Sequence, residues 1–167
     1  MIRMNIETSY NFRKIHDGLT TSGVVSRDCL KTLASQGYEV LVNLMPDESE
    51  YAVSDERTIV KSQNIEYIYI PVDFRQPKHS DFVKFSAALD RVLDEDKKVH
   101  IHCAANYRVS AFYALYAVSH DVWSIDKAWA FIHDVWQPAD HSGWSEFIVN
   151  VLGGTSDTHQ NAKKNHH

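Results

Sequence analysis

A cysteine and an arginine with four residues between them are the groups in this sequence best suited to chemistry. Cys103 follows a short alternation of apolar and polar residues, and Arg108 opens a long apolar segment. A helix amino terminus and a nearby guanidinium can lower the pKa of a cysteine by several units from about 8.5, which favours the nucleophilic thiolate. The planar guanidinium can donate two parallel hydrogen bonds to an oxyanion. The pair therefore predicts nucleophilic attack on a tetrahedral oxyanion.

A buried strand and a buried helix would position these two groups. The segment 98–103, K-V-H-I-H-C, alternates with period two, which is typical of a short strand that ends at Cys103. Residues 109–118 have almost no polar face, as expected for a helix enclosed on all sides. Free N–H groups at such a helix start bind dianions. The loop between strand and helix consists of Ala104, Ala105, Asn106 and Tyr107. An ordinary core cysteine on a buried strand is the alternative interpretation.

The segment 102–108, H-C-A-A-N-Y-R, resembles the signature loop of the cysteine-based protein tyrosine and dual-specificity phosphatases. The resemblance implies that Cys103 is the nucleophile, that residues 104–108 bind phosphate, and that His102 and Ser110 support the site. Three departures are visible. The loop is one residue shorter than usual, it lacks the family's glycine, and Val109 replaces the hydroxyl residue that normally follows the arginine, with Ser110 one place later. A bacterial branch, the beta-lactamase-hydrolase-like phosphatases, is more similar and tolerates such loops.

The resemblance extends upstream of the loop. G-Y-E-V-L-V-N-L-M-P-D and I-Y-I-P-V-D are similar to the matching segments of that branch, although Met45 stands where an arginine is expected. Asp73 precedes Cys103 at close to the family's spacing and is the candidate general acid for the leaving group. Asp47 is the reserve candidate and Glu48 a weaker one. A turn aspartate that follows a strand is the alternative interpretation of Asp73.

The order of the expected elements indicates the fold class. Strands are expected over 18–25, 38–45 and 66–72, and over the residues that lead up to Cys103; the first of them would lie at an edge of the sheet. No firm element is expected in 1–17. Helices are expected over 27–36 after Ser26, weakly over 48–62, from Ser80, after Ser124 and around 144–151. This alternation predicts an α/β fold with a mostly parallel central sheet and helices on both faces, like that of the phosphotyrosine phosphatases. Residues 45–47, 72–73 and 102–103 would meet at one rim of the sheet.

Composition limits the setting and the partners. The 167 residues, 44% hydrophobic and 23% charged, suit a single phosphatase-like domain over 1–154 followed by a disordered polar tail over 155–167. A net charge of −5 argues against a nucleic-acid or anionic-membrane partner. Cys29 and Cys103 make no disulfide framework, and a nucleophilic cysteine must stay reduced, which indicates the cytoplasm. No apolar run reaches the roughly 20 residues of a membrane span, and the first residues do not resemble a secretory signal.

Three function classes follow from these residues. The first is a phosphatase that hydrolyses a phosphomonoester, in protein phosphotyrosine or in a small molecule, through a phosphocysteine. The second is a rhodanese-like sulfurtransferase, because that class also carries a cysteine in a loop of about this shorter length. The third is a catalytically weak phosphate-binding regulatory module. No cofactor or metal is expected, since Cys103 would point away from the face that carries His100 and His102. The residues indicate no particular oligomeric state.

Overall fold

A computed structural model of the chain describes residues 5–153 and contains one five-stranded sheet. The strands are β1 (Arg13–His16), β2 (Leu19–Ser22), β3 (Val40–Asn43), β4 (Glu66–Tyr69) and β5 (Val99–His102). The α-helices are α1 (Arg27–Leu30), α2 (Glu56–Lys61), α3 (His79–Asp94), α4 (Tyr107–Ser119) and α5 (Ile125–Val135), followed by helical residues 144–153. Short 3₁₀ turns are η1 (Ile6–Thr8), η2 (Ala34–Gln36) and η3 (Pro138–Asp140).

The sheet is mostly parallel, as predicted. Its order is β1-β2-β5-β3-β4, and the three pairs β2–β5, β5–β3 and β3–β4 are parallel, whereas β1 runs antiparallel to β2. Strand β5 therefore lies at the centre, with Ile101 level with Thr21 on one side and Val42 on the other. The carboxyl end of β5 leads directly into Cys103.

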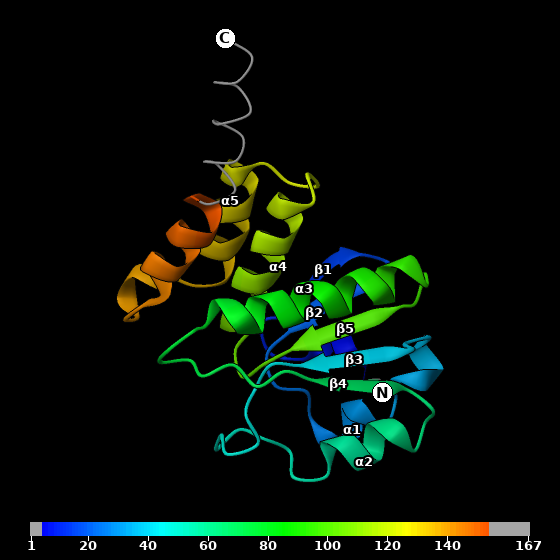
Figure 1. Ribbon diagram of the computed structural model, residues 1–167. Coiled ribbons are helices and arrows are strands. Elements are labelled where there is room, and N and C mark those ends of the chain that lie inside the picture. Colours follow the sequence, from blue (N-terminus) through cyan, green and yellow to red (C-terminus); the bar gives the residue numbers. More distant parts are fainter. Residues whose placement is uncertain (1–4, 154–167) are drawn as a thin grey trace.

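Helices cover both faces of the sheet (Figure 1), which confirms the predicted layers. Helices α1 and α2 lie on one face, over a small core that includes Leu30, Leu33 and Val60. Helices α3, α4 and α5 lie on the other face, over a larger core in which α4 is buried along most of its length. The absence of a polar face in 109–118 follows from this enclosed position.

Several predicted boundaries are wrong in detail. Helix α1 ends at Leu30 rather than at 36, because the Thr32 hydroxyl donates to the Cys29 carbonyl at 2.7 Å and the chain continues as a turn and η2. Ser80 is not the N-cap of α3, since the extended Lys78 carries the carbonyl that accepts the first helical bonds. Ser26 and Ser124 do cap α1 and α5 through their side chains, as predicted.

The amino-terminal segment differs most from expectation. No element was expected in 1–17, yet β1 lies there and forms the edge of the sheet. Strand β2, expected at an edge, is an interior strand between β1 and β5. Its polar side chains are buried without loss because they are hydrogen-bonded: Thr20 contacts Tyr38 and His100, each at 2.7 Å. The strands predicted over 38–45 and 66–72 and the helix predicted over 48–62 are present but shorter, whereas the helix predicted around 144–151 is helical over 144–153.

The predicted single domain over 1–154 and tail over 155–167 remain predictions, because residues 1–4 and 154–167 lie outside the described part of the chain. Within residues 5–153, no helix is both long enough and apolar enough to cross a membrane.

Candidate active site

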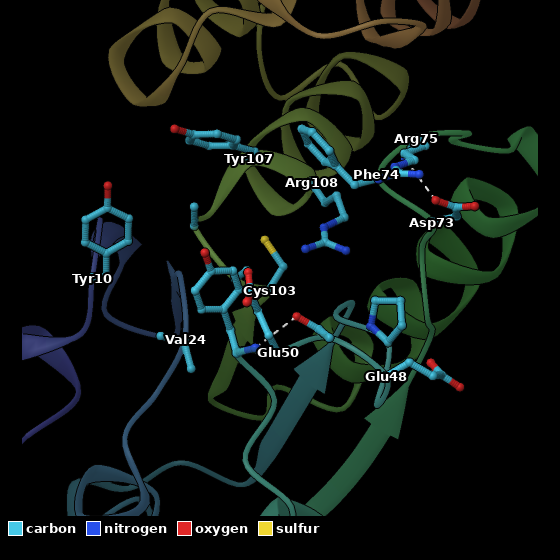
Figure 2. Close-up of a pocket in the computed structure, with 15 residues that line it drawn as sticks. Tyr10, Val24, Glu48, Glu50, Asp73, Phe74, Arg75, Cys103, Tyr107 and Arg108 are labelled. Atoms are coloured by element: carbon cyan, nitrogen blue, oxygen red, sulfur yellow. Dashed lines mark hydrogen bonds between the residues drawn. The ribbon is translucent and has the colours of Figure 1, made fainter.

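Cys103 lies at the floor of a cavity beyond the carboxyl ends of the strands (Figure 2). The cavity measures about 1350 Å³, and the Cys103 side chain is buried. Its walls come from four segments of the chain: Tyr10 and Val24; Pro46, Glu48, Ser49, Glu50 and Tyr51; Asp73, Phe74 and Arg75; and Cys103, Ala104, Ala105, Tyr107 and Arg108. The predicted convergence of the strand ends 45–47, 72–73 and 102–103 thus forms one concave surface.

The loop after Cys103 turns at Asn106, which has a left-handed backbone with φ 70° and ψ 5°. Glycine is the usual residue in this region, and asparagine is among the few others that enter it readily. The loop therefore makes its turn with an asparagine and without the glycine that the resemblance led us to expect. Its four intervening residues connect β5 to α4 directly.

The amino-terminal segment holds the loop in place. Asn11 Nδ2 donates to the Ala105 carbonyl at 3.0 Å, and Asn106 Nδ2 donates to the Asn11 carbonyl at 2.8 Å. The Val24 amide donates to the Ala104 carbonyl at 2.9 Å. Gly23 packs so closely that a Cβ there would lie 2.5 Å from the Ala104 carbonyl oxygen. The loop conformation is therefore set by contacts from residues 11–24.

Arg108 reaches the cavity as a buried cation that has no carboxylate partner among residues 5–153. Its Nη1 donates to the Val72 carbonyl at 2.9 Å, and its guanidinium lies 5.6 Å from the centre of the Phe74 ring. The side chain is 7% exposed, and its Nε has no hydrogen-bond partner within residues 5–153. Figure 2 shows the guanidinium beside the Cys103 sulfur. A buried charge of this kind is costly unless an anion pairs with it.

Backbone N–H groups surround the same space. Among residues 5–153, no hydrogen bond uses the N–H of Ala104, Ala105, Tyr107 or Arg108. Two of these groups belong to the first turn of α4, where N–H groups have no partner within the helix. Unpaired N–H groups, the helix amino terminus and Arg108 together make a site suited to a dianion next to a sulfur nucleophile.

His102 lies beneath the loop and contacts it from below. Its Nδ1 is 3.1 Å from the Cys103 carbonyl oxygen, and its Nε2 is 2.7 Å from Glu56 Oε2. Both side chains are buried. Burial alone would lower the pKa of His102, but the charge of Glu56 and its hydrogen bond outweigh burial and raise that pKa above its ordinary value. No motif in the sequence singles out Glu56, which is 46 residues from His102 in the chain.

Asp73 lines the cavity but does not face Cys103. The Arg75 amide donates to Asp73 Oδ1 at 2.9 Å, and Figure 2 shows the carboxylate turned toward Arg75. Of the other acids considered, Glu48 lines the cavity and Asp47 does not. Glu50, which the sequence analysis did not name, also lines it. The structure thus places three carboxylates, those of Glu48, Glu50 and Asp73, around the cavity.

Ser110 links the loop to a cluster of aromatic side chains. Its hydroxyl donates to the Tyr107 carbonyl at 3.0 Å and accepts a hydrogen bond from Trp136 Nε1 at 3.0 Å. Trp136 stacks on Tyr107 with ring centres 4.7 Å apart. Trp144 Nε1 donates to the Phe74 carbonyl at 2.7 Å. Both tryptophans are buried, and they contact Tyr107 and Phe74, two of the aromatic residues that wall the cavity.

His100 is fully engaged in hydrogen bonds and is not available as a ligand. Its Nδ1 lies 2.7 Å from the Thr20 hydroxyl and its Nε2 lies 2.7 Å from the Ser22 hydroxyl. Burial holds the pKa of His100 well below its ordinary value, so the ring is neutral. Within the described residues, no three His, Cys, Asp or Glu side chains are grouped so that they could hold a metal ion.

Comparison with known proteins places the chain in a class. No model of a known protein family matches the sequence, and no curated protein matches it. The catalytic core of the PP-IP phosphatase SIW14 of S. cerevisiae, in complex with citrate, is 14% identical with a TM-score of 0.67, over 90% of this chain and 94% of that chain. P. aeruginosa TpbA in complex with pTyr is 16% identical with a TM-score of 0.68, over 86% of each chain. The fold is that of the cysteine-based, protein-tyrosine-phosphatase-like enzymes, as predicted.

A nearer relative defines the family. A protein of Shewanella putrefaciens CN-32, provisionally assigned as a phosphatase (DUF442), is 31% identical with a TM-score of 0.79, over 89% of this chain and 95% of that chain. The chain belongs to this DUF442 family of the cysteine phosphatase superfamily.

Proposed function

We propose that this protein is a phosphatase that hydrolyses a phosphomonoester through a phosphocysteine intermediate at Cys103. The observation that carries the proposal is the buried Arg108, whose Nε has no partner within residues 5–153 and whose guanidinium lies beside Cys103. A phosphate dianion would pair with this cation and accept hydrogen bonds from the free N–H groups of the loop. TpbA, a structural neighbour, has been crystallised with pTyr, and phosphotyrosine is one candidate substrate here.

Each step of the proposed hydrolysis can be assigned to particular residues. The Cys103 thiolate attacks phosphorus, the S–P bond forms, and the bond from phosphorus to the ester oxygen breaks. A proton from Asp73 goes to the departing oxygen, which requires the Asp73 side chain to turn from the Arg75 amide toward the cavity. Water then attacks phosphorus, the S–P bond breaks, and the proton of the water passes to Asp73 while phosphate leaves. Arg108 and residues 104–107 stabilise the charge on the equatorial oxygens.

The test is hydrolysis of nitrophenyl phosphate by the purified chain without added metal. Cys103→Ser should abolish turnover, and Arg108→Lys, which keeps the charge but loses the planar fork, should lower it at least about 100-fold. Cys29→Ser, at the other cysteine, is the matched control and should leave turnover unchanged, because Cys29 contacts Thr8 and Asn5 and not the cavity. Turnover that survives Cys103→Ser would overturn the proposal. Sulfur transfer from thiosulfate to cyanide without ester hydrolysis would instead identify a sulfurtransferase.

The same assay can identify the general acid. Asp73→Asn should reduce hydrolysis of an alkyl phosphate, a poor leaving group, about 10²- to 10⁴-fold and affect nitrophenyl phosphate far less. If Asp73→Asn slows both substrates equally, Asp73 is structural, and Glu48→Gln and Glu50→Gln are the variants that follow.

A further inference from the structure

The buried pair Glu56–His102 lies directly beneath the nucleophile, and neither the fold class nor the motif explains it. Glu56 belongs to the first turn of α2 and is 46 residues from His102 in the chain, yet their side chains meet at 2.7 Å. Glu56 is 3% exposed and His102 is fully buried. A buried ion pair adds little net stability over apolar side chains of the same size, so stability alone does not explain its presence.

The hydrogen-bond partners determine where the protons are. A backbone carbonyl can only accept, so His102 Nδ1 must carry the hydrogen that bonds the Cys103 carbonyl. Tyr67 donates its hydroxyl hydrogen to Glu56 Oε2 at 3.1 Å and accepts a hydrogen bond from Asn43 Nδ2 at 2.9 Å. Glu56 Oε2 thus contacts both Tyr67 and His102, and its charge and hydrogen bond raise the pKa of His102, which favours the shared proton on His102 Nε2.

The contact with the Cys103 carbonyl has a geometric effect on the anion site. In a trans peptide the C=O and N–H groups point in opposite directions, and the described chain contains no cis peptide. A hydrogen bond from His102 that fixes the Cys103 carbonyl below the loop therefore directs the Ala104 N–H upward. The Ala104 N–H is one of the unpaired donors at the cavity floor.

We propose that Glu56 is a positioning residue for Cys103, acting through His102. The Glu56 carboxylate keeps the His102 ring doubly protonated, the ring holds the 103–104 peptide, and that peptide presents its N–H to the thiolate and to the bound anion. Four groups face His102: Glu56 from α2, the neutral His100 on β5, Cys103, and Arg108 from α4. Tyr67 from β4 acts on it only through its hydrogen bond to Glu56. Glu56 is the one carboxylate among them.

The proposal deepens the proposed phosphatase function, but one readout is independent of it. The thiolate of Cys103 can be titrated by the pH dependence of alkylation with iodoacetamide, corrected with the Cys103→Ser variant for reaction at Cys29. This measurement needs no phosphatase activity. In Glu56→Gln the introduced amide fills the same space but carries no charge. His102 then becomes neutral, and its ring no longer presents a positive charge to Cys103. We expect the pH midpoint of alkylation to rise by about one pH unit, which corresponds to about 1.4 kcal/mol.

Activity and rescue complete the test. Glu56→Gln should lower kcat for nitrophenyl phosphate between about 10- and 100-fold, as a misdirected oxyanion donor does. Glu56→Asp keeps the charge and should restore part of the midpoint and the rate. Tyr67→Phe, which removes a donor to the carboxylate, should shift the midpoint in the same direction by less, and it decides the question if Glu56→Gln does not fold. Asp126→Asn, at an exposed carboxylate in the first turn of α5, is the control and should change neither.

An unchanged alkylation midpoint in folded Glu56→Gln or Tyr67→Phe would overturn the positioning role. So would a Glu56→Asp variant no better than Glu56→Gln. If the midpoint shifts as expected but no variant or wild-type protein hydrolyses an aryl phosphate, the positioning role stands and the proposed phosphatase function fails.

Discussion

Asn11 and Asn106, 95 residues apart in the chain, hold each other's backbone: the side chain of Asn106 bonds the Asn11 carbonyl, and the side chain of Asn11 bonds the carbonyl of Ala105. Both residues have positive φ, 52° and 70° respectively. Each asparagine therefore serves twice, as a residue that tolerates a left-handed backbone and as a side-chain donor. The cavity depends on this pairing, because Asn106 immediately precedes the first turn of α4.

The two roles of Asn106 can be separated by substitution. Asn106→Gly and Asn106→Ala both lose the hydrogen bonds to Asn11 and Thr21. Only Asn106→Ala also carries the conformational free-energy cost of a left-handed backbone. We expect Asn106→Ala to be less stable than Asn106→Gly by about 1–2 kcal/mol in urea unfolding. Both should bind inorganic phosphate more weakly than the wild type. The comparison pair is Asn64→Gly and Asn64→Ala, at an exposed turn with φ 61°, which should show the stability difference without any change in phosphate binding. Equal stability of Asn106→Ala and Asn106→Gly would contradict the role of the left-handed backbone.

Gly23 is required by space and not by backbone conformation. A Cβ at this position would lie 2.5 Å from the Ala104 carbonyl oxygen and 2.9 Å from the Ala105 Cα, both backbone atoms that cannot rotate away. Gly23→Ala should therefore move the loop, reduce phosphatase turnover, and lower the free energy of unfolding by about 1–3 kcal/mol, as overpacking does. Gly153→Ala, where a Cβ meets nothing within 4 Å, is the matched control. A wild-type rate in Gly23→Ala would show that the 23–105 contact does not set the loop.

The carboxylates around the cavity should select against polyanionic substrates. Glu48, Glu50 and Asp73 line it, and among the described residues only Arg75 and Arg108 are basic residues of the lining. Two like charges about 8 Å apart in water repel by about 0.5 kcal/mol, so removing two carboxylates should favour a substrate with an added negative group about fivefold. The measurement is kcat/KM of Glu48→Gln/Glu50→Gln for phosphotyrosine peptides flanked by glutamate or by lysine. The wild type should prefer lysine, and salt should weaken that preference. A glutamate preference in the wild type would refute this account of the cavity.

His100 should make the fold sensitive to acid. Burial holds the pKa of His100 well below the ordinary 6.5. At acidic pH the unfolded chain therefore binds a proton at His100, and the folded chain does not. Stability is therefore lost as pH falls below about 6.5, at up to about 1.4 kcal/mol per pH unit. His102, with a raised pKa, has the opposite sign: its contribution is fully present below the ordinary pKa and is lost as pH rises through the raised value.

The two contributions can be distinguished by substitution. His100→Gln removes the acid-sensitive group, so the stability of this variant relative to wild type should improve between pH 7 and pH 5 by more than about 1 kcal/mol. Urea unfolding at the two pH values measures the change. A constant difference between His100→Gln and wild type would contradict a depressed His100 pKa.

The central strand, the loop and α4 could be predicted because their signals are local. Period-two alternation before Cys103 and an apolar run after Arg108 are each read within about ten residues. The N-caps Ser26 and Ser124 are local signals too. The resemblance of residues 102–108 then supplied the superfamily, which the fold comparison confirms.

The features that were missed depend on partners distant in the chain. The polar sequence of β2 reads as an edge strand unless Tyr38 and His100 are known to satisfy Thr20. Glu56 looks like an ordinary acidic residue in a first helical turn, and only the fold brings it to His102. Asn106, at the turn of the loop, is a signal that the sequence does contain. Asparagine tolerates positive φ, so it can take the place of the missing glycine.

The parallel pairing of β2 with β5 has a consequence for how the protein is made. Leu19 aligns with Val99, and the loop contacts from Asn11 and Gly23 join the same distant segments. During synthesis most of the chain must therefore leave the ribosome before β5 can enter the sheet. Until then, the side of β2 that pairs with β5 has no partner strand. Closing so long a loop costs entropy before any contact offsets that cost, so we expect the loop over residues 103–108 to form late in folding. A chain that stops short of β5 lacks Cys103 and leaves an open sheet edge.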